Sequence, residues 1–193
     1  MNVKEVKVLL IGYGYIGQFL YAHLKNKGFQ CNVISANLLN NEESLMNGRY
    51  ENLTTSFLSM FTHILWFAGH SSVSKSIVDP IGAIHNNLTY LFDLVCKIPN
   101  DVKLIYASSA SVYSGLPADS KADTNDGIMA ALNSYDSTKK AFDILIDPLD
   151  SMVVGLRMGT VSGWSPRLRP ELVFNQMNIS AIDNKQINVA NKD

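Results

Sequence analysis

The sequence is poor in the residue types that build metal sites and disulfides. It contains two cysteines, Cys31 and Cys96, whose spacing fits neither a metal knuckle nor a Cys-x-x-Cys redox motif. Its four histidines are scattered along the chain without the spacing of metal ligands. We therefore expect no metal site, and we expect both cysteines to be small buried hydrophobic residues.

The sequence also lacks an excess of charge of either sign and any long apolar run. Its 16 basic and 17 acidic residues give a formal net charge of −1, which argues against a nucleic-acid or membrane partner. The first apolar run, Val6–Ile11, is too short for a signal-peptide core or a membrane span. With 47% hydrophobic residues over 193 positions, we expect a soluble, cytoplasmic protein with a sizeable core.

Short runs rich in Val and Ile alternate with longer segments of helical period. Strand runs without polar alternation, separated by helices, are typical of a parallel sheet that is buried on both faces. The sequence therefore predicts an α/β fold with a doubly wound parallel sheet, the Rossmann fold. The expected strands are Val6–Ile11, Gln30–Ser35, His63–Phe67, Val102–Ala107 and Met152–Arg157, and the expected helices are Ile16–Lys27, Leu53–Met60, Ile81–Lys97 and Ser134–Ile146.

The regular hydrophobic pattern of the sequence ends after Arg157, where glycines and prolines interrupt it. One further helix is expected there, over Glu171–Ile182. We therefore expect a cofactor-binding Rossmann domain over residues 1–160. Residues 161–193 are expected to form only the beginning of a C-terminal substrate lobe.

The first expected strand runs directly into a glycine motif, Gly12-Tyr13-Gly14-Tyr15-Ile16-Gly17, and then into a helix. Such a loop lets backbone N–H groups and the positive end of a helix dipole meet the pyrophosphate of a dinucleotide. The acidic residue that would hold the ribose of NAD is missing, because nothing acidic follows Ser35 until Glu42. The cofactor is therefore NAD or NADP, and its expected contacts are Gly12, Gly14, Tyr15, Ile16, Gly17 and Ser35.

Tyr135 and Lys139 stand four residues apart, which places them on one face of the expected helix. An ordinary phenol, with a pKa of about 10, is a poor base at neutral pH, and a nearby ammonium group favours its phenolate form. The preceding strand leads into a serine-rich segment, YASSASVYSG, at the sheet edge where ligands bind. The pair is a candidate for acid–base chemistry, and the serines are candidates for binding a substrate oxygen. The alternatives are an exposed helix face and a turn rich in local hydrogen bonds.

The order of these segments resembles the extended short-chain dehydrogenase/reductases, the nucleotide-sugar epimerase/dehydratase family. The glycine loop, FAGHSSVSKSIVDPIGAIHNNL, YASSASVYSG, YDSTK and LRMGTVSG follow one another over nearly the whole chain. The resemblance implies that Tyr135 is the acid or base, that Lys139 is its partner, and that Ser109 orients the substrate. It further implies cofactor contacts at Ala68 and Gly69, together with nucleotide-sugar contacts at Ser111, Asn87, Thr160 and Arg167.

Two departures from the family pattern bear on the expected activity. Ala110 and Ser111 stand where 4,6-dehydratases carry an Asp-Glu pair that eliminates water, which argues against a dehydratase. Thr160 replaces an asparagine that contacts the sugar nucleotide in many epimerases, which leaves the substrate open. The resemblance therefore favours a nucleotide-sugar epimerase or reductase.

Two other hypotheses stay open from the sequence. The chain stops soon after Asn188 with most of the expected substrate lobe missing, so it is alternatively a cofactor-binding protein without catalysis. Such a protein would be a redox-sensing regulator or a remnant of an enzyme. A reductase of small carbonyls is the third hypothesis. The resemblance also implies a homodimer, formed through the helices expected at Ile81–Lys97 and Ser134–Ile146.

Overall fold

The computed structural model describes residues 5–36, 45–114, 131–147 and 152–187. In these residues six parallel strands form one sheet in the order β3-β2-β1-β4-β5-β6. The chain builds the sheet outward in both directions from β1, which is the doubly wound pattern, so the predicted Rossmann fold is confirmed. The strands are β1 (Lys7–Ile11), β2 (Gln30–Ser35), β3 (Leu45–Asn47), β4 (His63–Trp66), β5 (Lys103–Ser109) and β6 (Val153–Met158).

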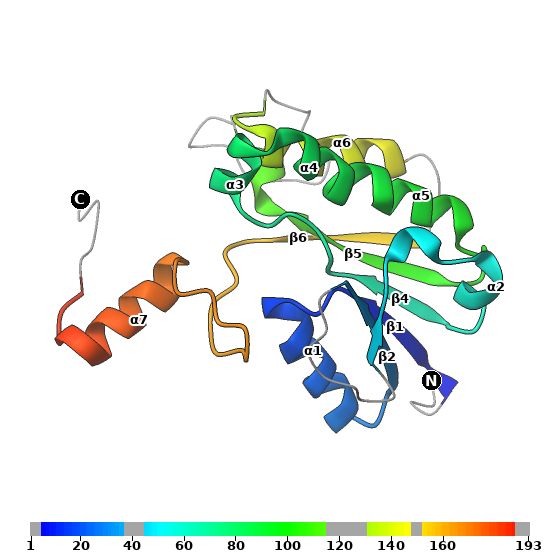
Figure 1. Ribbon diagram of the computed structural model, residues 1–193, viewed down its shortest axis with the longest axis horizontal. Helices are drawn as coiled ribbons and strands as arrows, with labels where there is room; N and C mark the ends of the chain where they lie inside the picture. The colour runs from blue at the N-terminus through cyan, green and yellow to red at the C-terminus, as the bar shows by residue number, and fades with distance from the viewer. Residues whose placement is uncertain (1–4, 37–44, 115–130, 148–151, 188–193) are drawn as a thin grey trace.

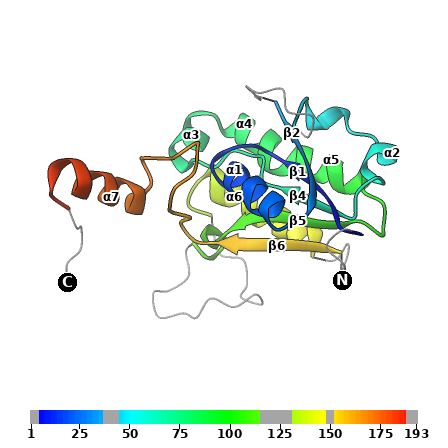
Figure 2. The ribbon, with the colours of Figure 1, turned by 90° about the horizontal axis from the view of Figure 1, so that it is seen from below.

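Helices cover both faces of the sheet (Figure 1). α1 packs on one face, and α4, α5 and α6 pack on the other, while α7 projects away from the sheet in both views (Figures 1 and 2). No helix that the structure describes is both long and apolar enough to cross a membrane. The helices are α1 (Tyr15–Asn26), α2 (Thr55–Leu58), α3 (Val73–Val78), α4 (Pro80–Ile84), α5 (Tyr90–Lys97), α6 (Ser134–Ile146) and α7 (Val173–Asn184), with a π-helical turn, His85–Thr89, between α4 and α5.

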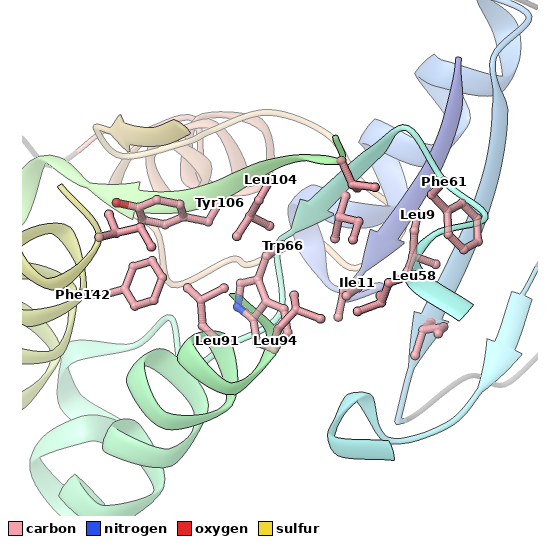
Figure 3. Packing of buried hydrophobic residues seen from close by; sticks show 14 residues of the cluster. Leu9, Ile11, Leu58, Phe61, Trp66, Leu91, Leu94, Leu104, Tyr106 and Phe142 are labelled. Atoms are coloured by element: carbon pink, nitrogen blue, oxygen red, sulfur yellow. The ribbon is translucent and has the colours of Figure 1, made fainter. Parts of the chain in front are cut away.

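Successive residues of β1 enter two separate cores. Leu9 and Ile11 belong to the cluster that includes Trp66 and Phe142, which lies between the sheet and the helices α5 and α6 (Figure 3). Val8 and Leu10 belong to the cluster on the side of α1. Because both faces of β1 are covered, the strand is an apolar run without polar alternation. Because all the strands are parallel, their carboxyl ends lie at one edge of the sheet, where the loops that follow them meet.

The strands expected from the sequence are present, with ends that differ by at most two residues, and β2 and α6 have the expected bounds. The strand β3 and the helix α3 are additional. The helix expected over Ile81–Lys97 is divided by the π-helical turn, and the one expected over Leu53–Met60 shortens to α2. Pro80 stands at the start of α4, where its missing N–H costs no helical hydrogen bond.

The expected burial of the cysteines is right for one of them and wrong for the other. Cys31 on β2 is buried, whereas Cys96 on α5 is exposed. The helix α5 turns Leu91 and Leu94 towards the core, and Cys96 falls on the opposite side of the same helix. Cys96 is therefore exposed because of its position on the helix, even though its thiol is apolar in character.

Candidate active site

The chain turns sharply from β1 into α1 through the glycine motif. Gly12 has a φ of +106°, and a Cβ atom there would overlap the backbone of Ala68 just after β4. A Cβ atom at Gly17, in the first turn of α1, would overlap the carbonyl oxygen of Gly12. Gly14 differs, because a Cβ atom added at this N-cap of α1 would meet nothing within 4 Å. The open side of the loop therefore faces the unpaired N–H groups of the first turn of α1, an arrangement that fits a pyrophosphate.

A pocket of about 310 Å³ lies beside this loop, at the carboxyl ends of β5 and β6. Six of the residues expected from the sequence to bind cofactor or substrate line it: Tyr15, Ile16, Ser109, Ser111, Tyr135 and Thr160. The remaining wall comes mainly from Ser71 and Val73, from the end of β6, and from Arg169 and Leu172. The structure thus brings the glycine loop, the serine segment and Tyr135 to one cavity, while the role of each residue stays a prediction.

Tyr135 and Lys139 are carried by α6, whose start is fixed by a local cap. The side chain of Asn133 accepts a hydrogen bond of 2.9 Å from the backbone N–H of Asp136. One turn later, the Nζ of Lys139 lies 5.9 Å from the centre of the Tyr135 ring. Burial lowers the pKa of Lys139 to about 8, an effect that the negative charge of Asp143 opposes. The pair therefore places a buried cation next to a phenol that lines the pocket.

The serine segment supplies two hydroxyls to the same pocket. The Oγ of Ser109 accepts a hydrogen bond of 3.1 Å from the backbone N–H of Ser111, which leaves its own proton available for donation. The Oγ of Ser111 is buried and has no hydrogen-bond partner among the described residues. With the Tyr135 phenol, these groups can bind the oxygen of a carbinol or carbonyl and exchange a proton with it.

A network around Asp143, which the sequence analysis missed, joins α6 to β5 and β6. The Asp143 carboxylate accepts hydrogen bonds from the Oη of Tyr106 (2.6 Å) and the Oγ of Ser108 (3.0 Å). It also accepts one from the Nε of Arg157 at 2.8 Å, and Arg157 donates in turn to the Oη of Tyr113. Burial, and then the hydrogen bond to Asp143, raise the pKa of Tyr106 and keep its hydroxyl protonated. The signal in the sequence is the placement of Asp143 one helical turn after Lys139.

Asn87 and His70 connect the end of β4 to α6. Asn87 is buried in the π-helical turn, and its Oδ1 accepts a hydrogen bond of 2.8 Å from the His70 N–H. Its Nδ2 donates to the carbonyl oxygen of His70 and to the Oγ1 of Thr138 on α6. Asn87 thereby holds the segment that contains Ala68 and Gly69, and it does not line the 310 Å³ pocket.

Two further expected contacts lie elsewhere. Arg167 is exposed and does not line the pocket, whereas Arg169 does. The Nη1 of Arg169 donates to the Oγ of Ser71 over 3.0 Å, and its Nε donates to Glu171. Ser35 ends β2, and residues 37–44, which come after Ala36, lie outside the described part of the chain.

The chain has relatives of known activity. It is 29% identical over 160 residues to the UDP-glucose 4-epimerase of Bacillus subtilis (strain 168), a match that covers 72% of this chain and 46% of the relative. It is 28% identical over 136 residues to UDP-glucuronate 4-epimerase 1 of Arabidopsis thaliana, covering 67% of this chain and 31% of that one. The chain thus spans less than half the length of these curated relatives.

Solved structures have the same fold. The UDP-glucose 4-epimerase of Thermus thermophilus, a complex with NAD, has a TM-score of 0.72 at 23% identity, covering 91% of this chain and 61% of that one. The NAD-dependent NDP-hexosamine 5,6-dehydratase TunA has a TM-score of 0.76 at 20% identity, with coverage of 97% and 65%. The model of the NAD dependent epimerase/dehydratase family matches residues 8–191. The chain therefore belongs to the NAD dependent epimerase/dehydratase family.

Proposed function

We propose that this chain binds NAD at its glycine loop and oxidises or reduces a carbinol of a nucleotide sugar, as an epimerase or a reductase. The observation that carries the proposal is the pocket in which the glycine loop, Ser109 and Tyr135 converge. The open side of the loop at Gly14 and the N-terminus of α1 suit a dinucleotide diphosphate. NAD rather than NADP is favoured by the relatives, among them the Thermus epimerase in complex with NAD.

Three side chains, those of Ser109, Tyr135 and Lys139, would carry out the proton transfer. The bound nicotinamide would accept a hydride and, in an epimerase, return it to the same carbon. Ser109 donates a hydrogen bond to the reacting oxygen, and Tyr135 takes up or returns its proton. At neutral pH the buried ammonium group of Lys139, with a pKa of about 8, is mostly protonated and stabilises the phenolate formed at Tyr135.

Elimination of water is not part of the proposal, although one structural neighbour is a dehydratase. Ala110 and Ser111 form the start of a 3₁₀ turn after β5. Neither side chain is an acid or a base at neutral pH, so this turn offers no pair for removing a proton and a hydroxyl. We therefore expect a product of unchanged mass from an epimerase and no dehydrated sugar.

Turnover by the purified chain with NAD or NADH on a panel of UDP-, GDP- and dTDP-sugars tests the proposal. Chromatography of the sugar products is expected to show conversion by the wild type and none by Tyr135→Phe. Tyr90→Phe is the matched control, because Tyr90 lies on α5 and makes its ring contacts with Tyr50 and His85. Full activity of Tyr135→Phe would contradict the proposal. NAD binding without turnover on any sugar would favour the non-catalytic alternative.

We also propose that two copies of the chain associate through the outer face of α3, α4 and α6. These helices pack against one another, and they leave large apolar side chains exposed, namely Ile77, Ile81, Ile84, Ile144 and Leu145. An exposed apolar patch of this kind is typical of a protein interface. Sedimentation equilibrium at micromolar concentration is expected to give a dimer, and Ile81→Glu a monomer. A wild-type monomer at that concentration would contradict the proposal.

The division of the chain at residue 160 also stays a proposal. The segment that follows β6 supplies Thr160, Val161, Arg169 and Leu172 to the pocket wall. These residues line the same pocket as Ser109 and Tyr135, where the reacting carbinol is proposed to bind. We therefore propose that residues 161–193 begin the substrate-binding part of the protein.

A further inference from the structure

Three residues that are distant in the sequence form a closed ring of hydrogen bonds. The Oη of Tyr15 donates to the carbonyl oxygen of Gly163 over 2.6 Å. The N–H of Gly163 donates to the Oδ1 of Asn175 over 2.9 Å, and the Nδ2 of Asn175 donates to the Oη of Tyr15 over 3.1 Å. Each member both gives and receives a hydrogen bond, so this hydrogen-bond ring satisfies the Tyr15 hydroxyl, the backbone N–H and carbonyl of Gly163 and the Asn175 amide at once.

Neighbouring contacts reinforce the hydrogen-bond ring. The Oγ of Ser165 donates to the carbonyl oxygen of Tyr15 over 2.6 Å, and the Nδ2 of Asn175 also donates to the carbonyl oxygen of Arg169 over 3.0 Å. Ser165 and Asn175 are 2% and 4% exposed, respectively. Gly163 has a φ of +116°, a conformation that favours glycine and that the hydrogen-bond ring requires at this position. The hydrogen-bond ring is therefore a built feature of the fold and not a chance contact of surface side chains.

The hydrogen-bond ring, together with the contact between Arg169 and Ser71, holds α7 and the segment before it against the Rossmann domain. α7 projects away from the sheet in both views (Figures 1 and 2), and Asn175 is its buried residue. Other large side chains of α7, such as Phe174 and Ile182, are exposed. The segment between β6 and α7 therefore takes its position from a few polar contacts, of which those at Tyr15 join it directly to the glycine loop.

Tyr15 belongs to both halves of the candidate site. Its backbone begins α1 at the open side of the glycine loop, and its hydroxyl reaches the segment that carries Thr160 and Arg169 into the pocket wall. We propose that Tyr15 is a positioning residue that couples dinucleotide binding at the loop to the placement of residues 159–175 on the substrate side. This inference rests on the proposed NAD binding.

The coupling follows from linkage. A ligand that fixes the start of α1 also fixes the Tyr15 hydroxyl, and the hydrogen-bond ring then favours one position of the segment after β6. A purely structural role would make a different prediction. In that case, removal of the hydroxyl would lower the stability of the segment equally with and without NAD. The dependence on NAD therefore distinguishes the two roles.

Amide hydrogen exchange over residues 159–175, measured with and without saturating NAD, tests the coupling. In the wild type NAD is expected to slow exchange there by about fivefold or more, the usual lower range of coupling between sites. Tyr15→Phe keeps the aromatic side chain and the backbone of the loop, and at an NAD concentration that saturates the variant it is expected to lose the slowing. Tyr90→Phe, the matched removal of a hydroxyl on α5, is expected to keep it. Asn175→Ala breaks the hydrogen-bond ring from its other side and is expected to match Tyr15→Phe, with no further loss in the double variant.

Three results of these measurements would overturn the inference. NAD-dependent slowing in Tyr15→Phe equal to that of the wild type would overturn the inference. Loss of NAD binding in Tyr15→Phe would also overturn it, because the hydroxyl would then belong to the cofactor site itself. Absence of NAD binding by the wild type would overturn the proposed function and this inference with it. If Asn175→Ala does not fold, as judged by circular dichroism, the result for Tyr15→Phe decides alone.

Discussion

The Nζ of Lys139 donates a hydrogen bond of 2.8 Å to the carbonyl oxygen of Ala107, two residues before Ser109 on β5. Lys139, the candidate partner of Tyr135, is thereby tied to the strand that carries Ser109. Asp143, one turn further along α6, fixes the same helix to Tyr106 and Ser108 of that strand. The candidate catalytic groups are therefore held as one unit, and the predictions below test how that unit is stabilised.

The buried ammonium group of Lys139 should make the stability of the protein depend on pH. Burial lowers its pKa from 10.5 to about 8, so between these values the folded protein has released a proton that the unfolded chain still holds. The contribution of Lys139 to the free energy of unfolding should therefore rise with pH above about 8, by about 3 kcal/mol at full titration. Urea unfolding of the wild type and of Lys139→Met at pH 7 to 10 measures this contribution as the difference between the two.

The methionine variant keeps most of the apolar stem of the side chain and removes the charge together with the hydrogen bond to Ala107, a loss that does not vary with pH in the variant. Other groups that titrate in this range are common to both proteins and cancel in the difference. At pH 7 the difference should lie near its low-pH limit, because Lys139 is mostly protonated in both the folded and the unfolded state. Two unfolding free energies that stay parallel up to pH 10 would show that Lys139 is not buried as a cation.

The network at Asp143 should contribute more to stability than an exposed ion pair does. Asp143→Asn leaves the guanidinium group of Arg157, whose side chain is 28% exposed, without its counter-charge. We expect a loss of about 2–4 kcal/mol in the free energy of unfolding. Asp93→Asn is the matched control, since Asp93 pairs with Lys97 on the exposed side of α5, and it should cost about 0.5 kcal/mol or less. Equal losses in the two variants would contradict this assignment.

Substitutions at two glycines of the loop, Gly17 and Gly14, should have separate effects on folding and on cofactor binding. Gly17→Ala places a Cβ atom against the carbonyl oxygen of Gly12, so we expect a loss of about 2 kcal/mol or more in stability. Gly14→Ala meets no protein atom and should change stability by only about 0.5 kcal/mol. It should nevertheless weaken NAD binding, because the methyl group occupies the side of the loop that a phosphate approaches. Thermal unfolding together with NAD titration distinguishes the two, and unchanged NAD affinity in a folded Gly14→Ala would exclude the loop as the cofactor site.

Arg169 and Arg167 should differ in their effect on the substrate. Arg169 lines the pocket and is held there by Ser71, while Arg167 is exposed. With whichever nucleotide sugar proves to be the substrate, Arg169→Gln should raise KM by about tenfold or more, as expected for loss of a charged contact. Arg167→Gln should change KM by less than about twofold. A larger effect at Arg167 would restore the contact predicted from the sequence.

The sequence predicts the sheet well because buried parallel strands carry a strong local signal. β2 and α6 have the expected bounds, since an apolar run and a helical period each identify one kind of element. β3, with three residues, is too short to show any period. α3 has only six residues, which is too short to show a helical period, and its start is set by the cap that Ser72 provides. The π-helical turn at His85–Thr89 interrupts a helical pattern that continues through it, so the sequence indicates one longer helix.

The residues of the candidate site are likewise predictable from the sequence only where a local motif marks them. Tyr135, Lys139, Ser109 and the glycine loop are identified by motifs, and the structure places all but the buried Lys139 and the loop glycines on the pocket. Arg167 and Arg169 are two residues apart in an irregular segment, where no period indicates which one turns inward. The contact between Tyr15 and Asn175 joins positions separated by 160 residues, and neither residue carries a local signal for it. Such contacts follow only from the folded arrangement of the chain.

The mass of the intact protein under native conditions, after incubation with NAD and separately with NADP, tests the central claim most directly. The proposed function predicts one NAD bound per chain, with a weaker or absent adduct for NADP. Gly14→Ala serves as the control, because the same folded chain should lose the adduct. A wild-type protein that stays at the bare mass of its chain at millimolar NAD would contradict the account of the glycine loop and of the chemistry proposed beside it.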